Sequence, residues 1–156
     1  MRLVTTYLPR AYATPDDLEA RAHMMSAAAM GATAFQKGLG AIHAMSHPVG
    51  AVFNTHHGTT NAVCMPAVLA FNADAIRGRF DQAAAYLGID GGFDGFCEFV
   101  QQFNDSFAIP RTLTEMGVSA DRLDDLVAMA LEDPSCGGNP VELTADSLRG
   151  LFRACF

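Results

Sequence analysis

The sequence has 156 residues, of which half are hydrophobic and 17% are charged, and this composition excludes an intrinsically disordered chain. A formal net charge of −7, with only ten basic residues, argues against nucleic acid and anionic membrane surfaces as partners, because both require a clustered positive surface. No apolar run approaches the ~18–20 residues of a membrane-spanning helix, and the first residues do not resemble a signal peptide. We therefore expect one domain, residues 1–156, with no membrane segment.

Helical hydrophobic spacing begins at the first residues of the chain. The apolar residues within 3–8 have this spacing, although no capping residue precedes them. The sequence Thr-Pro-Asp-Asp at 14–17 predicts a helix start with Thr14 as the N-cap, and this helix is expected to reach about Gly38. A following helix over residues 39–47 is expected to end or kink at Pro48.

The remaining sequence also predicts helices. Residues 50–58 are interpreted as a connection, after which Thr59 or Thr60 is expected to cap an apolar helix that contains Pro66. Further helices are expected over residues 75–87, 93–103, 119–132 and 144–155, with Gly88, Ser119 and Thr144 as end or start signals. No long alternating pattern predicts a strand. The expected fold class is all-α, a multi-helix bundle.

Four cysteines are spread widely along the chain, at Cys64, Cys97, Cys136 and Cys155. None forms a CxxC pair, so the spacing indicates neither a zinc ribbon nor a disulfide framework. Free thiols of this kind are typical of a reducing compartment, and we expect a cytoplasmic protein.

Four of the five histidines, His43, His47, His56 and His57, fall within fifteen residues. His43 and His47 are four residues apart and share a face if the segment is helical. Two imidazoles on one face, joined by a third from a nearby loop, could hold Fe, Zn, Cu or Ni. A hydrogen-bonded or surface pair of histidines fits the same spacing, so both interpretations stay open. His23 is interpreted as structural.

Sequence motifs for nucleotide binding are absent. The segment Gly38-Leu39-Gly40 is followed by His43 where a dinucleotide-binding GxGxxG motif has its third glycine, and no strand precedes it. The phosphate-binding motif GxxxxGK[ST] is not found, and neither is the hydrolase nucleophile motif GxSxG. We therefore predict no cofactor-binding residue in this chain.

A much more specific pattern extends from Gly38 to Asn72, which reads GLGAIHAMSHPVGAVFNTHHGTTNAVCMPAVLAFN. It contains a histidine, a second histidine four residues later followed by Pro-x-Gly, a His-Gly ten residues further on, and an Asn-Ala helix. This pattern resembles the signature of the iron-containing (group III) alcohol dehydrogenases. Residues 18–21 (LEAR) and 133–140 (DPSCGGNP), with the capped helix from Thr144, extend the similarity over essentially the whole chain.

The resemblance implies a fold and a set of site residues. Family members have an N-terminal Rossmann-like domain that binds NAD(P) and a helical metal-binding domain, and this chain is similar to most of the second. In the family an Asp and a His on an early helix, together with two later histidines, hold the catalytic divalent metal. The later two match His43 and His57. His47 matches an active-site histidine near the nicotinamide and the proton path, which implies a catalytic role. His56 stands where many members have Pro, and no role is carried over to it.

The resemblance also implies an activity. The Asp and the first His of the family's metal site would lie before Met1, together with the NAD(P) domain. The chain is therefore expected to be the metal-binding part of an NAD(P)-dependent alcohol dehydrogenase, which alone binds Fe²⁺ or Zn²⁺ weakly and turns over little substrate. A homo-oligomer is expected, with the Met-rich helix around residues 24–30 or the histidine helices at the contact, unless an N-terminal half completes the site. The alternatives are a stand-alone helical binding or scaffold module and a metal-binding protein without redox function.

Overall fold

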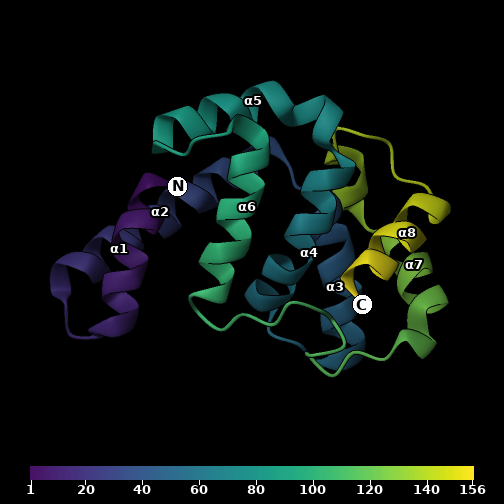
Figure 1. Ribbon diagram of the computed structural model, residues 1–156. Helices are drawn as coiled ribbons and strands as arrows, with labels where there is room; N and C mark the ends of the chain where they lie inside the picture. The colour runs from purple at the N-terminus through teal and green to yellow at the C-terminus, as the bar shows by residue number, and fades with distance from the viewer. The chain divides into compact units, whose positions relative to one another are not determined.

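The computed structural model describes all residues from 1 to 156 and contains helices and no strands, which confirms the all-α class (Figure 1). The α-helices are α1 (Arg2–Ala13), α2 (Leu18–Ala34), α3 (Ala41–Phe53), α4 (His57–Phe71), α5 (Ala73–Leu87), α6 (Gly92–Asp105), α7 (Leu123–Glu132) and α8 (Ala145–Cys155). The short 3₁₀ helices are η1 (Phe35–Lys37), η2 (Ala120–Arg122) and η3 (Pro134–Gly138). The chain divides into two compact units, Met1–Gly38 and Leu39–Phe156, which we call the N-terminal hairpin and the main bundle. No helix is long and apolar enough to cross a bilayer.

The N-terminal hairpin consists of α1, α2 and η1. Its second helix begins at Leu18, so the prediction of Thr14 as the N-cap is wrong. Asp17 is the N-cap, because its carboxylate accepts a hydrogen bond from the backbone N–H of Ala20 at 3.0 Å. Thr14 instead forms the turn, where its carbonyl accepts a hydrogen bond from the N–H of Asp17 at 3.0 Å. Arg10 from α1 favours this arrangement, because its guanidinium donates to Asp17 at 2.8 Å.

The two helices of the hairpin are joined by hydrogen bonds from Arg10 to Asp17 and Glu19 and by one ring pair. The rings of Tyr7 and His23 are stacked with their centroids 3.9 Å apart. Ala20 is the only buried residue of the hairpin, and Met25 and Met30 are exposed. The hairpin therefore has almost no apolar core of its own.

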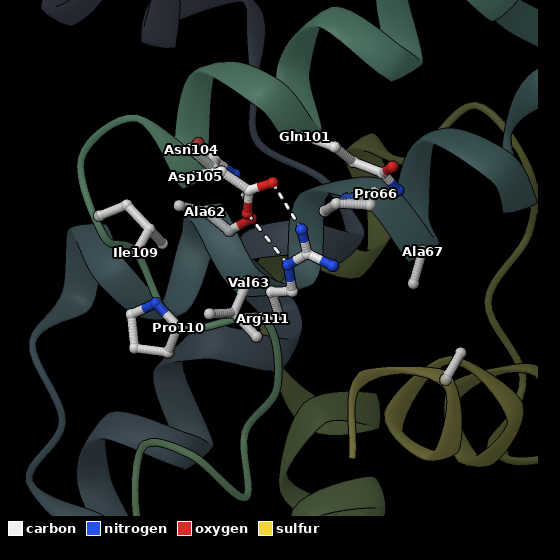
Figure 2. Close-up of a pocket in the computed structure, with 11 residues that line it drawn as sticks. Ala62, Val63, Pro66, Ala67, Gln101, Asn104, Asp105, Ile109, Pro110 and Arg111 are labelled. Carbon is white, nitrogen blue, oxygen red and sulfur yellow. Dashed lines mark hydrogen bonds and ion pairs between the residues drawn. The ribbon is translucent and has the colours of Figure 1, made fainter.

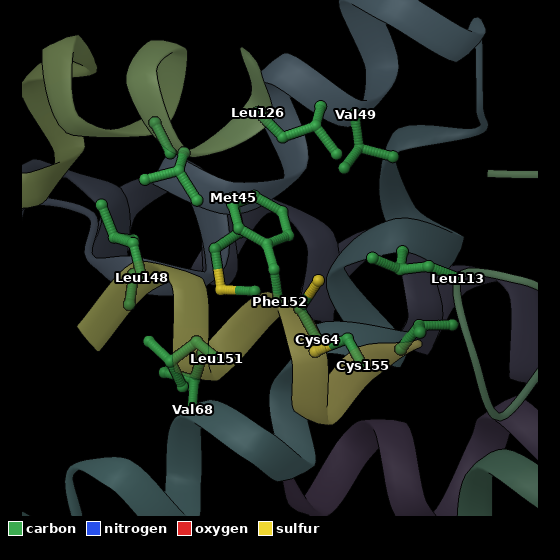
Figure 3. Packing of buried hydrophobic residues seen from close by; sticks show 14 of the residues in the cluster. Met45, Val49, Cys64, Val68, Leu113, Leu126, Leu148, Leu151, Phe152 and Cys155 are labelled. Atoms are coloured by element: carbon green, nitrogen blue, oxygen red, sulfur yellow. The ribbon is translucent and has the colours of Figure 1, made fainter. Parts of the chain in front are cut away.

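The main bundle is organised around a four-helix arrangement in which α3 and α8 each contact both α4 and α7. Their facing side chains form one apolar core (Figure 3). The largest fully buried apolar members include Met45 and Val49 from α3, Leu126 from α7, and Leu148 and Phe152 from α8. Burying an aliphatic or aromatic side chain of this size contributes about 1.5–3 kcal/mol. The helix predicted over residues 144–155 is confirmed as α8, and its buried residues are Leu148, Leu151, Phe152 and Cys155.

Helices α5 and α6 form a second, smaller cluster with the C-terminal end of α4. Phe93 and Phe96 of α6 pack with their edges against Phe80 of α5 at ring-centroid distances of 6.0 and 4.9 Å. Gly88 ends α5 with a positive φ of 74°, as predicted from the sequence. The main bundle thus rests on two adjoining apolar clusters.

The sequence predicts that the helix over residues 39–47 ends or kinks at Pro48, and the predicted end is wrong because α3 continues past Pro48. Proline removes one backbone donor from a helix, but Met45 and Val49 on either side are fully buried and favour continuation. The helix ends at Phe53, where Asn54 adopts a left-handed conformation with φ 53° and ψ 40°. The expected connection over residues 50–58 is therefore reduced to residues 54–56.

A pair of asparagines fixes the start of α3. Asn72 and Asn139 each donate a side-chain hydrogen bond to the other, at 3.0 and 2.9 Å, and Asn139 also accepts from the backbone N–H of Ala41 at 3.2 Å. Gly40 has no side chain with which to cap the helix, so Asn139 performs this role from 98 residues away. The contact ties the N-terminus of α3 to η3 and to the end of α4.

Candidate functional site

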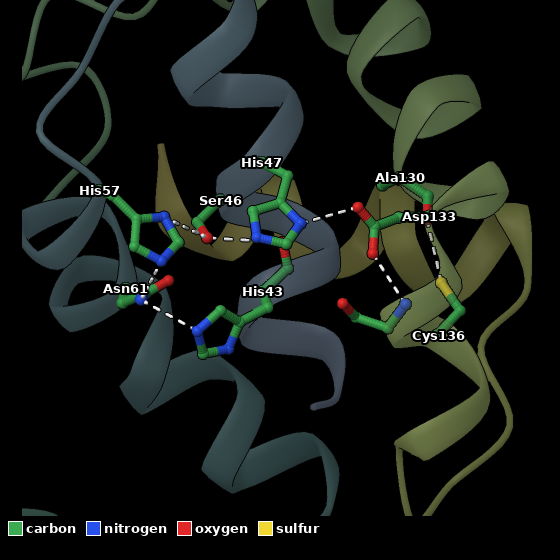
Figure 4. Close-up of polar contacts among 9 residues, drawn as sticks. His43, Ser46, His47, His57, Asn61, Ala130, Asp133 and Cys136 are labelled. Carbon is green, nitrogen blue, oxygen red and sulfur yellow. Dashed lines mark hydrogen bonds and ion pairs between the residues drawn. The ribbon is translucent and has the colours of Figure 1, made fainter. Parts of the chain in front are cut away.

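Three of the five histidines converge in the main bundle (Figure 4). His43 and His47 lie one turn apart on α3, and His57 is the first residue of α4. The ring centroid of His57 lies 5.2 Å from that of His43 and 5.5 Å from that of His47, and His43 and His47 are 5.7 Å apart. The structure therefore brings together the three histidines to which the resemblance assigns roles.

The side chain of Asn61 links two of these rings. Asn61 lies one turn after His57 on α4, and its amide nitrogen is 3.1 Å from Nε2 of His57 and 3.4 Å from Nε2 of His43. The amide NH₂ has two protons, so it can donate one to each ring. Both Nε2 atoms then act as acceptors and face the same point, while the ring protons reside on Nδ1. Oδ1 of Asn61 is buried without a hydrogen-bond partner.

His47 makes a different contact, with a carboxylate from the loop before η3. Its Nδ1 lies 2.8 Å from Oδ2 of Asp133. The other carboxylate oxygen of Asp133 accepts a hydrogen bond from the backbone N–H of Ser135 at 2.8 Å. Burial raises the pKa of Asp133, but the hydrogen bonds from His47 and Ser135 outweigh it and hold that pKa below the ordinary aspartate value. Asp133 is therefore an anion beside His47.

The electrostatics of the cluster favour an uncharged His43. Partial burial lowers the pKa of this histidine, and the neighbouring His57 and His47 lower it further because adjacent positive charges repel one another. A neutral imidazole retains the nitrogen lone pair with which it binds a metal ion. The local environment thus keeps the ring in the state that coordination requires.

The other two histidines lie outside the cluster. The ring Nδ1 of His56 accepts a hydrogen bond from the backbone N–H of Thr59 at 3.3 Å, which makes His56 the N-cap of α4. The expectation that Thr59 or Thr60 caps this helix is therefore wrong. The hydroxyl of Thr60 instead donates to the carbonyl of His56 at 3.1 Å. His23, stacked on Tyr7, belongs to the N-terminal hairpin.

The donors of the cluster meet some of the requirements of a divalent cation. Two imidazole Nε2 atoms that face one point are suitable ligands for iron or zinc. The orphaned Oδ1 of Asn61 beside them adds a polar atom without a protein partner. No group of three His, Cys, Asp or Glu side chains is arranged to hold a metal ion. The residues therefore fit two positions of a metal site and leave the others unfilled.

A cavity of about 220 Å³ lies in another part of the main bundle, lined by α4, α6 and residues 109–111 (Figure 2). Three of its four polar side chains, those of Asn104, Asp105 and Arg111, are already paired. Arg111 binds the carboxylate of Asp105 through two hydrogen bonds of 3.0 and 2.6 Å, and Asn104 donates to the carbonyl of Ala62 at 3.3 Å. No histidine lines this cavity, so it does not belong to the histidine cluster.

Sequence reasoning missed Asn61 and Asp133 as members of the cluster. Asn61 carried a usable signal, because it follows His57 by four residues and so shares a helix face with it. Asp133 carried no such signal for a contact with His47, since 86 residues separate the two. Both residues lie within the segments that carry the family resemblance, where the resemblance assigned them no role.

Comparisons with known proteins give consistent results. Residues 1–156 match the sequence profile of the Fe-containing alcohol dehydrogenase family, C-terminal region. The 4-hydroxybutyrate dehydrogenase of Cupriavidus necator is 40% identical over 155 residues, which cover 94% of this chain and 40% of that protein. The NAD-dependent methanol dehydrogenase of Bacillus methanolicus is 35% identical, with 98% of this chain and 42% of that protein covered.

The crystal structure of a 1,3-propanediol oxidoreductase superposes with a TM-score of 0.93 at 29% identity. The superposition covers 99% of this chain and 43% of that protein. The chain thus spans about two fifths of the length of the curated relatives and of the solved structure that it matches.

Proposed function

Because the chain belongs to the Fe-containing alcohol dehydrogenase family, we propose that it forms the metal-binding part of an NAD(P)-dependent alcohol dehydrogenase. The observation that carries this proposal is the convergence of two ring nitrogens, Nε2 of His43 and of His57, on the amide nitrogen of Asn61. An amide NH₂ and a metal cation both bind to the lone pair of a nitrogen atom. A position at which one NH₂ engages two imidazoles is therefore a position at which one cation can engage both.

In this proposal His43 and His57 hold a divalent cation, Fe²⁺ or Zn²⁺. Such a cation supplies Lewis-acid polarisation of an alcohol or carbonyl oxygen, and NAD(P) supplies the hydride chemistry. His47 stands beside both ligands, and its Nε2 is the atom that accepts or returns the hydroxyl proton. The chain's own contribution is to hold two ligands, exclude water on the side of the apolar core and provide one proton acceptor.

The substrate class is proposed from the relatives. Those named above act on 4-hydroxybutyrate and methanol, and the similar solved structure is a 1,3-propanediol oxidoreductase. These compounds share a primary alcohol on a short carbon chain. We propose a short primary alcohol, or the corresponding aldehyde, as the substrate of the complete site.

Partners and location follow from the same proposal. Two imidazoles bind a cation more weakly than a complete ligand set, because each further ligand adds a bond and preorganisation. The site is completed by an N-terminal half or by another copy of the chain, and the exposed Met25 and Met30 offer an apolar surface for self-association. The four free cysteines are consistent with a reducing compartment, and we propose a cytoplasmic location.

Calorimetric titration with Zn²⁺ tests the proposal. We expect saturable binding of one ion per chain, and a loss of affinity of at least about tenfold in His43→Ala and in His57→Ala. His23→Ala is the matched control and should bind as the unchanged chain does. Equal binding by all four proteins would refute the assignment of the ligands.

Enzyme assays complete the test. With a short primary alcohol, NAD⁺ and Fe²⁺, the 156-residue chain alone should show little or no turnover. A rate in the range of ordinary enzymes, ~1–10³ s⁻¹, would contradict the proposal that another half is required.

A further inference from the structure

We propose that Asp133 is the positioning residue of His47, fixing the ring proton on Nδ1 and thereby keeping Nε2 as an open lone pair. The catalytic use of that lone pair rests on the function proposed above, whereas the tautomer itself is a property of this chain. The side chain of Asp133 is hydrogen-bonded to His47 and to the backbone N–H of Ser135, and the proposal concerns its contact with His47.

The contact has the geometry of a charge-assisted hydrogen bond. Nδ1 of His47 is 2.8 Å from Oδ2 of Asp133, within the short range of such bonds. An ionised carboxylate can only accept, so Nδ1 must carry the proton that it donates. A neutral imidazole has one ring proton, which leaves Nε2 unprotonated. Figure 4 shows this second ring nitrogen on the side of His57 and Asn61.

The carboxylate is held more firmly than the ring that it orients. The side chain of Asp133 is 13% exposed and that of His47 is 42% exposed. Oδ1 of Asp133 is committed to the backbone N–H of Ser135 at 2.8 Å, which makes Asp133 the N-cap of η3. One carboxylate oxygen therefore accepts a backbone hydrogen bond, and the other accepts a hydrogen bond from the histidine ring.

The segment that carries Asp133 is anchored at both ends. Pro134 follows directly and restricts the backbone at the start of η3. At the other end Asn139 is bonded to Asn72 and to the N–H of Ala41, at the start of the helix that carries His47. A Cβ atom at Gly138 would collide with the carbonyl of Leu39, so the two backbones approach closely there. Asp133 and His47 are thus held by elements that are tied to each other.

An Asp133→Asn variant gives a distinctive prediction because of this anchoring. The N–H of Ser135 needs an acceptor, so the amide oxygen of the substituted side chain must turn toward Ser135 and its NH₂ must face His47. Nδ1 of His47 then has to accept, and its proton moves to Nε2. An NH₂ group that faces an unprotonated Nδ1 is favoured over an NH₂ group that faces a protonated Nδ1. The difference is large enough to change the tautomer ratio of His47 about tenfold or more.

The experiment records long-range ¹H–¹⁵N correlation spectra of the 156-residue chain labelled with ¹⁵N-histidine, in the absence of metal and at about pH 9, where imidazoles are neutral. The expected result is an Nδ1–H tautomer of His47 in the unchanged chain and an Nε2–H tautomer in Asp133→Asn. Asp81→Asn is the matched control, since Asp81 also accepts from a backbone N–H, that of Phe93 at 2.7 Å, with no histidine bonded to it. This control should leave His47 unchanged.

A second variant separates capping from positioning. Asp133→Ser keeps an oxygen for the N–H of Ser135, since serine is a good N-cap, but its side chain is too short to bridge to His47. We expect a helical chain in which His47 has lost its preference for Nδ1–H. An unchanged His47 tautomer in both Asp133 variants would overturn the proposal. The zinc titration is independent of this result, so a failure of the tautomer test leaves the ligand assignment standing, and the reverse also holds.

Discussion

The N-terminal hairpin and the main bundle are both helical, but they are stabilised in different ways. The main bundle buries a continuous set of apolar side chains from several helices, whereas the hairpin buries only Ala20 and exposes Leu18, Met25 and Met30. The hairpin is held by exposed ion pairs, such as Arg10 with Asp17, and such pairs contribute little because solvent screens them. Helical content alone therefore does not indicate stability. The burial of each helix face decides it.

The candidate site lies entirely in the better-packed unit. His43 and His47 share α3 with the fully buried Met45 and Val49, and His57 begins a helix that contributes Cys64 to the same core. Side chains on packed helices are held more precisely than side chains on mobile loops, which suits a site that requires convergent ring nitrogens. The two units should therefore respond differently to substitution and to acid.

The largest expected effect comes from the same substitution made in both units. Leu148 is fully buried in α8, and Leu18 is 78% exposed at the start of α2. Leu148→Ala should lower the free energy of unfolding by about 2–5 kcal/mol, because it removes buried methyl groups and leaves a cavity. Leu18→Ala should change it by no more than about 0.5 kcal/mol. Urea unfolding followed by circular dichroism measures both. Equal losses would show that the burial contrast does not govern stability.

A smaller loss is expected at the asparagine pair that ties η3 to α3. Asn139→Ala removes the partner of the buried Asn72 and the acceptor for the N–H of Ala41. Unsatisfied buried polar groups cost about 1–3 kcal/mol, and this loss should appear in the main bundle. The double variant with Asn72→Ala should lose less unfolding free energy than the sum of the losses in the two single variants, because each single variant already removes the same hydrogen bonds between Asn72 and Asn139. Strict additivity in this cycle would argue against the coupling.

The smallest effect is expected on the stability of the N-terminal hairpin at low pH. The backbone N–H of Ala20, followed by the guanidinium of Arg10, holds the pKa of Asp17 below its ordinary value of 3.8. A lowered folded-state pKa means that the stabilisation is present above the ordinary value and is lost as the pH falls through the folded-state value. NMR signals of α2 should therefore shift toward coil values in acid before those of α3 and α8. In Asp17→Asn the hairpin should not show this acid transition, and a transition that persists there would contradict the assignment.

Local signals allowed much of the fold to be predicted from the sequence. Thr144 and Ser147 form the capping box of α8, and Gly88 ends α5, because these signals act within one turn of the chain. The start of α2 was misplaced because Thr14 and Asp17 are both good caps, and the hydrogen bond from Arg10 to Asp17 comes from a different helix. The end of α3 was misplaced because tertiary burial on both sides of Pro48 outweighs the local preference of proline.

The candidate site was predictable only in part. Histidines at positions 43 and 47 share a helix face by spacing, and the resemblance added His57. The contact of Asp133 with His47 depends on how α3, α7 and η3 pack, and local sequence does not encode that packing. Asn61 is intermediate, since its helix position was predictable whereas its two ring contacts depend on the approach of α3 to α4.

The central claim is that His43 and His57 direct their Nε2 atoms to one cation. Titrating the ¹⁵N-histidine-labelled chain with Zn²⁺ and following each ring nitrogen by NMR tests it most directly. The account predicts that the Nε2 resonances of His43 and His57 change together and saturate at one equivalent, while those of His23 and His56 stay in place. A change confined to one of the two rings, or an equal response of His23, would contradict it.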